Sequence, residues 1–165
     1  KEYYSGFGPA AGLVEAYFSY WDKYCQSRPG GWLSNDVDQA NIAFPPTVFP
    51  PAEKLLSSAL VAAKGSPLPE FENRVRFLQA GLEHAKLSAR FMASLVSLGR
   101  WSGSAVVDNT VNPVRFEESK RLLRELTKFR RDHERWYISD YLDASRRENA
   151  IVKNLESILD DVNIP

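Results

Sequence analysis

The longest regular pattern in the sequence is a series of apolar residues that recur in steps of three and four between about Glu70 and Leu98. Its members are Val75, Leu78, Leu82, Ala85, Ala89, Met92 and Val96. This spacing places them on one face of an α-helix, and a rise of about 1.5 Å per residue gives that helix a length of roughly 40 Å. Because such a helix is longer than a small domain is wide, other helices must lie along it. We therefore predict one long central helix over about residues 68–99.

Shorter segments with helical spacing predict further helices on either side of this one. They cover about residues 9–26, 51–64, 113–133 and 143–160. Prolines stand at the start of the first three, where a missing N–H costs nothing, and Asn112 before Pro113 is a typical N-cap. An alternating strand pattern occurs only in the short stretch 105–107. The predicted fold class is therefore all-α, an antiparallel bundle of four to five helices.

Two single residues carry local expectations. Gly81 lies inside the long helix, where glycine costs roughly 1 kcal/mol relative to alanine, so we predict that another backbone comes close to it. Cys25 shares a helical face with Trp21 and Phe18, which predicts a buried structural thiol rather than a nucleophile. As the single cysteine of the sequence, Cys25 also excludes an internal disulfide and a cysteine cluster for zinc.

The length and composition of the chain allow it to form its own core, and its charge balance argues against some partners. A chain of 165 residues with 44% hydrophobic content can bury a core without metal or disulfide support. Twenty-one basic and twenty-one acidic residues give a net charge of zero, so we predict neither nucleic acid nor membrane as a partner. The chain starts at Lys1 without an initiator methionine and soon enters a helix. Together with the length, this predicts that residues 1–165 are a single helical domain and a piece of a longer polypeptide.

Patterns that indicate catalysis or metal binding are weak. His84 and His133 are the two histidines, and neither lies in a motif for nucleophilic catalysis. A di-metal site in a bundle would need Glu-x-x-His pairs, and the adjacent Glu83 and His84 point about 100° apart on a helix. Paired carboxylates such as Glu117 and Glu118 are typical of solvated charge on an exposed helix. We therefore predict no catalytic residue, no metal ligand and no cofactor.

The remaining candidates for binding are mainly aromatic. Indole rings stack on the flat faces of sugars, while arginine and histidine bond the hydroxyls, so such a mixture is compatible with carbohydrate contact. It is equally compatible with core closure or a domain interface, and the alternating charges of residues 130–135 favour a surface of salt bridges. The candidate carbohydrate or interface contacts are Trp32, Phe44, Phe49, Trp101, Arg130, His133, Trp136 and Tyr137.

Three segments carry a resemblance to a known family. Residues 2–18, which begin EYYSGFGPAA, resemble the region just after the catalytic barrel of α-glucuronidase-like bacterial glycoside hydrolases. The sequences FPPAEKLL at 49–56 and RVRFLQAGLEHA at 74–85 extend the resemblance in the same order. It implies the C-terminal helical region of a polysaccharide-degrading enzyme that is exported to the periplasm or the cell exterior. The acid and base carboxylates of that family belong to the barrel, so none is assigned to a residue here.

This resemblance supports a first hypothesis and leaves two others open. The first is a non-catalytic accessory domain that packs on, or dimerises, a glycoside-hydrolase barrel of the same polypeptide, with Trp32, Phe44 and Phe49 facing that barrel. On this hypothesis the parent protein is an enzyme, whereas the fragment alone is not, and a homodimer is a second implied partner. The alternatives are a helical carbohydrate-binding module that uses Trp101 and Trp136 to bind a polysaccharide, and a scaffold or interaction bundle.

Overall fold

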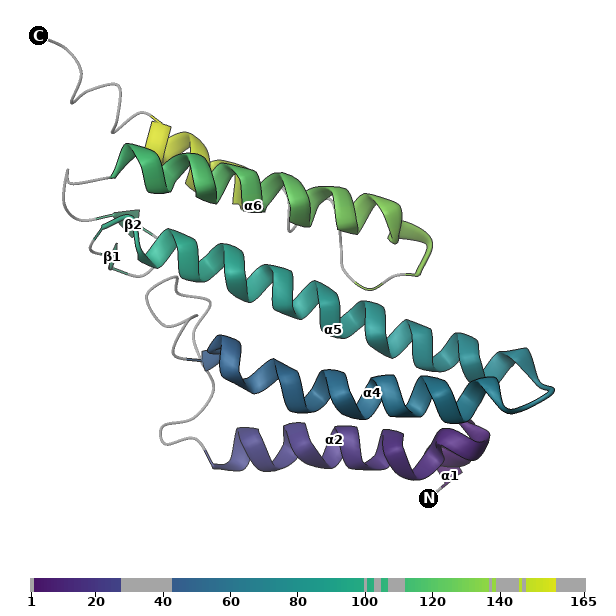
Figure 1. Ribbon diagram of the computed structural model, residues 1–165. Coiled ribbons are helices and arrows are strands. Elements are labelled where there is room, and N and C mark those ends of the chain that lie inside the picture. The colour runs from purple at the N-terminus through teal and green to yellow at the C-terminus, as the bar shows by residue number, and fades with distance from the viewer. Residues whose placement is uncertain are drawn as a thin grey trace, which may run out of the picture. The chain divides into compact units, whose positions relative to one another are not determined.

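A computed structural model of the chain describes residues 2–27, 43–99, 101–102, 105–106, 112–136, 138, 146 and 148–156. Figure 1 shows the α-helices α1 (Glu2–Ser5), α2 (Ala11–Gln26), α4 (Phe49–Lys64), α5 (Pro69–Val96) and α6 (Pro113–Asp132). Residues 148–156 form a further helix, called here the C-terminal helix. Short 3-10 turns are η1 (Gly8–Ala10), η2 (Pro46–Val48) and η3 (Glu134–Trp136), and β1 (Trp101–Ser102) pairs antiparallel with β2 (Ala105–Val106). The fold is an all-α helical bundle, as predicted.

The chain divides into two compact units, and the division falls within α5. Unit 1 comprises residues 1–32 and 46–83, and it contains α1, α2, α4 and the first half of α5. Unit 2 comprises residues 33–45 and 84–165, and it contains the second half of α5, α6 and the C-terminal helix. The prediction of one folded domain over the whole chain stays a prediction.

The core of unit 1 forms where η1, α2, α4 and the first half of α5 meet. Its buried residues are Phe7, Ala10, Val14, Ala59, Ala63 and Val75. Trp21 of α2 packs edge-on against Phe49 at the start of α4, with 6.0 Å between ring centroids. The hydroxyl of Tyr20 donates a hydrogen bond of 2.6 Å to the carbonyl of Val48. The end of α2 therefore lies beside the start of α4, and the two helices run antiparallel (Figure 1).

The turn before α2 depends on a glycine. Gly8 has a φ of +52°, in the left-handed region, and a Cβ at this position would lie 2.4 Å from ring carbons of Phe71 in α5. Two residues earlier, the carbonyl of Gly6 accepts a hydrogen bond from Nη1 of Arg74. The turn is thus packed directly against α5, and position 8 has no room for a side chain.

The core of unit 2 forms between the second half of α5, α6 and the C-terminal helix. Its buried residues are Leu87, Phe91, Leu95, Leu98, Phe116, Leu122, Leu123, Leu126, Val152 and Leu155. The helix α6 begins as predicted, because the Oδ1 atom of Asn112 accepts a hydrogen bond of 3.1 Å from the backbone N–H of Arg115. This cap satisfies one of the amide groups that a helix leaves unpaired at its N-terminus.

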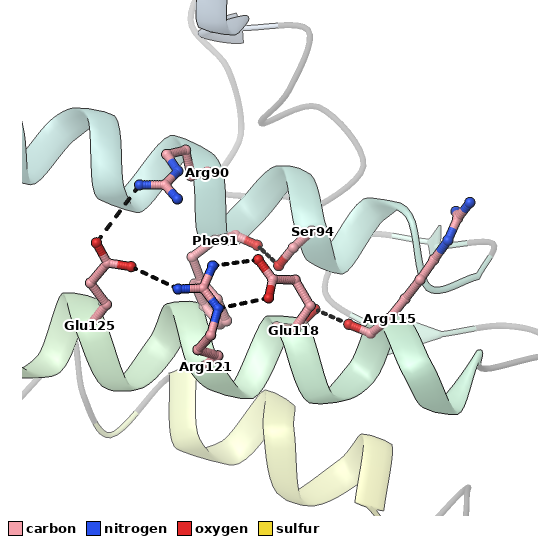
Figure 2. Close-up of polar contacts among 8 residues, drawn as sticks. Arg90, Phe91, Ser94, Arg115, Glu118, Arg121 and Glu125 are labelled. Atoms are coloured by element: carbon pink, nitrogen blue, oxygen red, sulfur yellow. Dashed lines mark hydrogen bonds and ion pairs between the residues drawn. The ribbon is translucent and has the colours of Figure 1, made fainter.

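Charged side chains join α5 to α6 on the surface of unit 2. Figure 2 shows that Arg121 lies between Glu118 and Glu125, with nitrogen-to-oxygen distances of 2.5 and 3.4 Å. Glu125 in turn lies 3.8 Å from Arg90 of α5. The neighbouring guanidinium lowers the pKa of Glu118 through its hydrogen bonds. These pairs are exposed, so water and salt screen them and each contributes little to stability.

The long helix was predicted correctly in extent, but its single apolar face was not. Val75 and Leu82 are buried as expected, whereas Ala85 is exposed and the second half buries Leu87 and Phe91 instead. At 3.6 residues per turn, this second set lies roughly 120–160° around the helix from Val75. The predicted face is therefore only partly right after Leu82. Met92 and Val96 do pack against the core of unit 2, but they stay partly exposed, and the larger Leu87 and Phe91 side chains fill that core instead.

Two local expectations are also wrong. A Cβ added to Gly81 would meet nothing within 4 Å among the described residues, so none of their backbones packs closely against that glycine. Cys25 is exposed. Cys25 lies one helical turn after Trp21, and Trp21 already contacts Phe49, the first residue of α4. The cysteine therefore lies beyond the start of α4, which does not cover it.

Candidate functional site

Three polar side chains meet inside unit 2, and we call them the buried polar cluster. Arg130, in the last turn of α6, is only 5% exposed. Its Nη2 atom donates a hydrogen bond of 3.0 Å to Oε1 of Glu148, and Nη1 donates to the second carboxylate oxygen. Its Nε atom donates a hydrogen bond of 2.9 Å to Nε2 of His84 in α5. One arginine thus joins α5, α6 and the C-terminal helix.

The geometry of the cluster suits a structural role. A bidentate pair between guanidinium and carboxylate gives short, charge-assisted hydrogen bonds, and these offset the cost of removing both charges from water. The side chain of Glu148 is 14% exposed and that of Arg130 is 4% exposed, so solvent screens the pair weakly. The cluster is therefore positioned to fix how the three helices of unit 2 pack.

The same surroundings keep His84 neutral. Burial, and then the positive charge of Arg130, lower the pKa of His84 from 6.5 to about 4. Because Nε2 accepts the hydrogen bond from Arg130, the proton of the neutral ring must be on Nδ1. A histidine with so low a pKa is a weak base at neutral pH, so this arrangement favours a hydrogen-bond acceptor over a catalytic group.

We expect the protein to lose stability as the pH falls from about 6.5 to about 4. The native state holds His84 neutral while the unfolded state takes up its proton, so the unfolded state gains free energy from protonation in this window. Urea denaturation of the wild type and of His84→Gln across this range measures the effect. Glutamine keeps a hydrogen-bond acceptor for Arg130 but does not titrate. The free energy of unfolding of the variant should therefore fall less than that of the wild type over this pH range. Parallel curves for the two proteins would contradict this assignment.

An aromatic stack continues from the cluster to the surface. The ring of Phe129 stacks on that of His133, with centroids 4.1 Å apart, and His133 meets Trp136 edge-on at 5.4 Å. The Nδ1 atom of His133 lies 2.9 Å from the carbonyl oxygen of Phe129. Trp136 is 40% exposed. The structure thus brings together the predicted contacts His133 and Trp136, whereas Arg130 points inward and is buried.

The other predicted contacts are spread over the chain. Trp32 and Tyr137 lie outside the described residues. The backbone of Trp101 belongs to β1, and Phe44 is 39% exposed. Phe49 is only 3% exposed, so it packs inside unit 1 and does not face a partner as we had expected.

Unit 1 has a further surface that was not predicted from the sequence, and we call it the N-terminal groove. It is lined by Tyr3, Gly6, Phe7, Arg74, Phe77 and Leu78. Tyr3 is 60% exposed and Phe77 is 45% exposed, although both are large and aromatic. A signal for Phe77 exists in the sequence, because it stands two residues after Val75 and so points away from the apolar face of the helix.

The described part of the chain contains neither a metal-holding group of side chains nor a helix that could span a membrane. Among those residues, no group of three or more His, Cys, Asp or Glu side chains is placed to hold a metal ion. None of the described helices combines the length and the apolar character needed to cross a bilayer. Comparison with known proteins also gives no assignment: no protein-family model, no curated protein and no solved structure matches this chain.

Proposed function

We propose that this chain is a non-catalytic helical accessory domain that docks on another protein domain through the N-terminal groove. The observation that carries the proposal is the exposure of Tyr3 and Phe77, at 60% and 45%, in one groove that Arg74 also lines. Large aromatic side chains and arginine are the residue types that contribute most to protein interfaces. While the two rings are exposed to water they contribute no hydrophobic free energy, whereas burial against a partner would be favourable.

The groove is also ordered before any partner binds. Arg74 is held by its hydrogen bond to the Gly6 carbonyl, and the ring of Tyr3 packs edge-on against Phe7 at 5.7 Å and Phe18 at 5.8 Å. Side chains that are already fixed lose less conformational freedom on binding, so more of the contact energy appears as affinity. This supports a docking surface over a chance exposure of two rings.

The family resemblance supplies the class of partner. On that basis the partner is the catalytic barrel of a polysaccharide-degrading glycoside hydrolase within the same polypeptide, and the protein acts in the periplasm or outside the cell. The chain itself takes no part in bond cleavage. A second copy of the chain is the other partner that the resemblance implies, and sedimentation of the purified chain would detect it.

Titration of the purified chain with the separately expressed remainder of its natural polypeptide tests the proposal. We expect calorimetry to show binding, and Phe77→Ala to weaken it at least about tenfold, which corresponds to about 1.4 kcal/mol. Val61→Ala is the matched control, because Val61 is 73% exposed on α4 and does not line the groove. Its affinity should stay within about twofold of the wild type, as expected for an apolar side chain outside the interface.

Two outcomes would count against the proposal. If the remainder of the polypeptide does not bind, the accessory role is wrong. If it binds equally well to the wild type and to Phe77→Ala, another surface makes the contact. Circular dichroism on each variant confirms that the substitution leaves the helices intact.

The carbohydrate-binding alternative is favoured by one observation, the exposure of Trp136 beside His133 at the end of α6. An exposed indole can stack on a sugar ring. Titration with acidic oligosaccharides, followed by tryptophan fluorescence in the wild type and in Trp136→Ala, separates the two functions. A change that the variant abolishes would support a carbohydrate-binding module.

A further inference from the structure

A second groove lies in unit 2, between α6 and the C-terminal helix, and we call it the basic groove. Eight described residues line it, and four of them are basic whereas none is acidic. The basic residues are Lys120, Arg124, Lys128 and Arg131, all from α6. The groove is therefore a local positive surface on a chain whose net charge is zero.

The four cations form one line along α6. They are separated by four, four and three residues, so they share one face of the helix and follow each other at steps of about 6 Å over roughly 16 Å. Arg124 and Arg131 are exposed, and the side chain of Lys128 is 76% exposed. A ligand in the groove would meet a row of charges with a regular spacing.

Two of these cations form ion pairs with carboxylates that do not line the groove. Lys120 lies 2.6 Å from Glu117 and 3.9 Å from Glu156, and Lys128 pairs with Asp132. Such exposed pairs contribute little free energy, so the carboxylates of a ligand can replace them at small cost. Among the described residues, Arg124 has no carboxylate at ion-pair distance. Arg124 is therefore the cation most available to a ligand.

The base of the groove is apolar. Leu123 of α6 and Val152 of the C-terminal helix both line it, while most of each side chain is buried in the core of unit 2. None of the eight described lining residues is aromatic. Single-stranded nucleic acids and sugars both bind largely by stacking on aromatic rings, so this lining favours neither.

An acidic amphipathic helix fits these features. Glutamates four residues apart on a helix repeat every 6 Å or so, the same step as the lysines and arginines of α6. Apolar residues beside those glutamates would face the base of the groove, as in other complexes in which a helix binds in a groove. We propose that the basic groove binds an acidic amphipathic helix of a partner protein. This site is separate from the N-terminal groove and does not depend on the proposed accessory function.

A designed peptide tests this site directly. The probe is a fluorescein-labelled helical peptide of about 18 residues, with glutamates every fourth position and leucines beside them, and the readout is fluorescence anisotropy. We expect saturable binding to the wild-type chain that weakens as salt is added. Arg124→Glu should lower the affinity at least about tenfold, since it replaces an attractive charge with a repulsive one. The control Lys54→Glu changes the net charge equally at an exposed site on α4 and should leave the affinity within about twofold.

Three outcomes would overturn the proposal. The peptide could fail to bind, or bind equally to the wild type and Arg124→Glu. A scrambled peptide of the same composition could bind as tightly, which would reduce the interaction to attraction between net charges. An oligothymidylate or an acidic oligosaccharide could bind more tightly than the peptide and lose affinity in Arg124→Glu. That result would show that the groove is a site for nucleic acid or for carbohydrate instead.

Discussion

Replacing Glu148 with alanine is expected to lower the free energy of unfolding by about 3 kcal/mol. The substitution removes the carboxylate but leaves the guanidinium of Arg130 in place, where only 4% of that side chain is exposed. A buried charge without its partner keeps the full cost of desolvation, so the loss greatly exceeds that of an exposed ion pair. Urea denaturation at pH 7 gives the value, and a loss below about 1 kcal/mol would show that water reaches the pair.

A double substitution separates the role of the charges from that of the packing. Arg130→Met with Glu148→Leu removes both charges and keeps apolar volume at both positions. We expect it to recover most of the stability that Glu148→Ala loses, because well-packed apolar groups often replace a buried pair at little cost. If the double variant is as unstable as the single one, the hydrogen bond to His84 and the fixed geometry of the pair contribute more than charge neutralisation does.

Replacing Gly8 with alanine is expected to destabilise unit 1 by about 2–4 kcal/mol. The left-handed backbone at φ +52° disfavours any residue with a Cβ, and that Cβ would overlap the ring of Phe71 at 2.4 Å. To make room, either the turn or the long helix α5 has to shift. Thermal or urea denaturation measures the loss.

Gly12→Ala is the matched control for that substitution. Gly12 lies in the first turn of α2, and an added Cβ would meet nothing within 4 Å among the described residues. Alanine favours the helix over glycine by up to about 1 kcal/mol, so this variant should be slightly more stable than the wild type. A value for Gly8→Ala within about 0.5 kcal/mol of the wild type would mean that the turn relaxes freely, as a surface position does.

The helices and some of their ends could be predicted from local patterns. Asn112 followed by Pro113 marked the start of α6, and the cap is present because it depends only on neighbouring residues. The extent of α5 was predicted for the same reason, since helical spacing and the absence of an internal proline are local properties. The start of α4 at Phe49, two residues before the predicted Pro51, is a difference within the usual uncertainty of helix ends.

The buried polar cluster could not be predicted, because it depends on which segments meet in space. Arg130 stands in a run of alternating charges that is typical of an exposed surface, and its partner Glu148 is 18 residues away. Helical spacing places Arg130 four residues after the buried Leu126 and Arg131 about 100° further round the helix, but it does not show which carboxylate meets the buried guanidinium. The two grooves were missed for the same reason, since each combines side chains from two or more elements.

The sharing of α5 between two apolar cores has a consequence for how the protein melts. Of its 28 residues, about half belong to each unit, and a free helix of that length is only marginally stable in water. If one core unfolded, its half of α5 would fray. The half of α5 in the other core would then lose the helix that continues it, and that core would be destabilised. Unfolding should therefore be cooperative across the described chain, and backbone amides in both halves of α5 should exchange their hydrogens with solvent at similar rates.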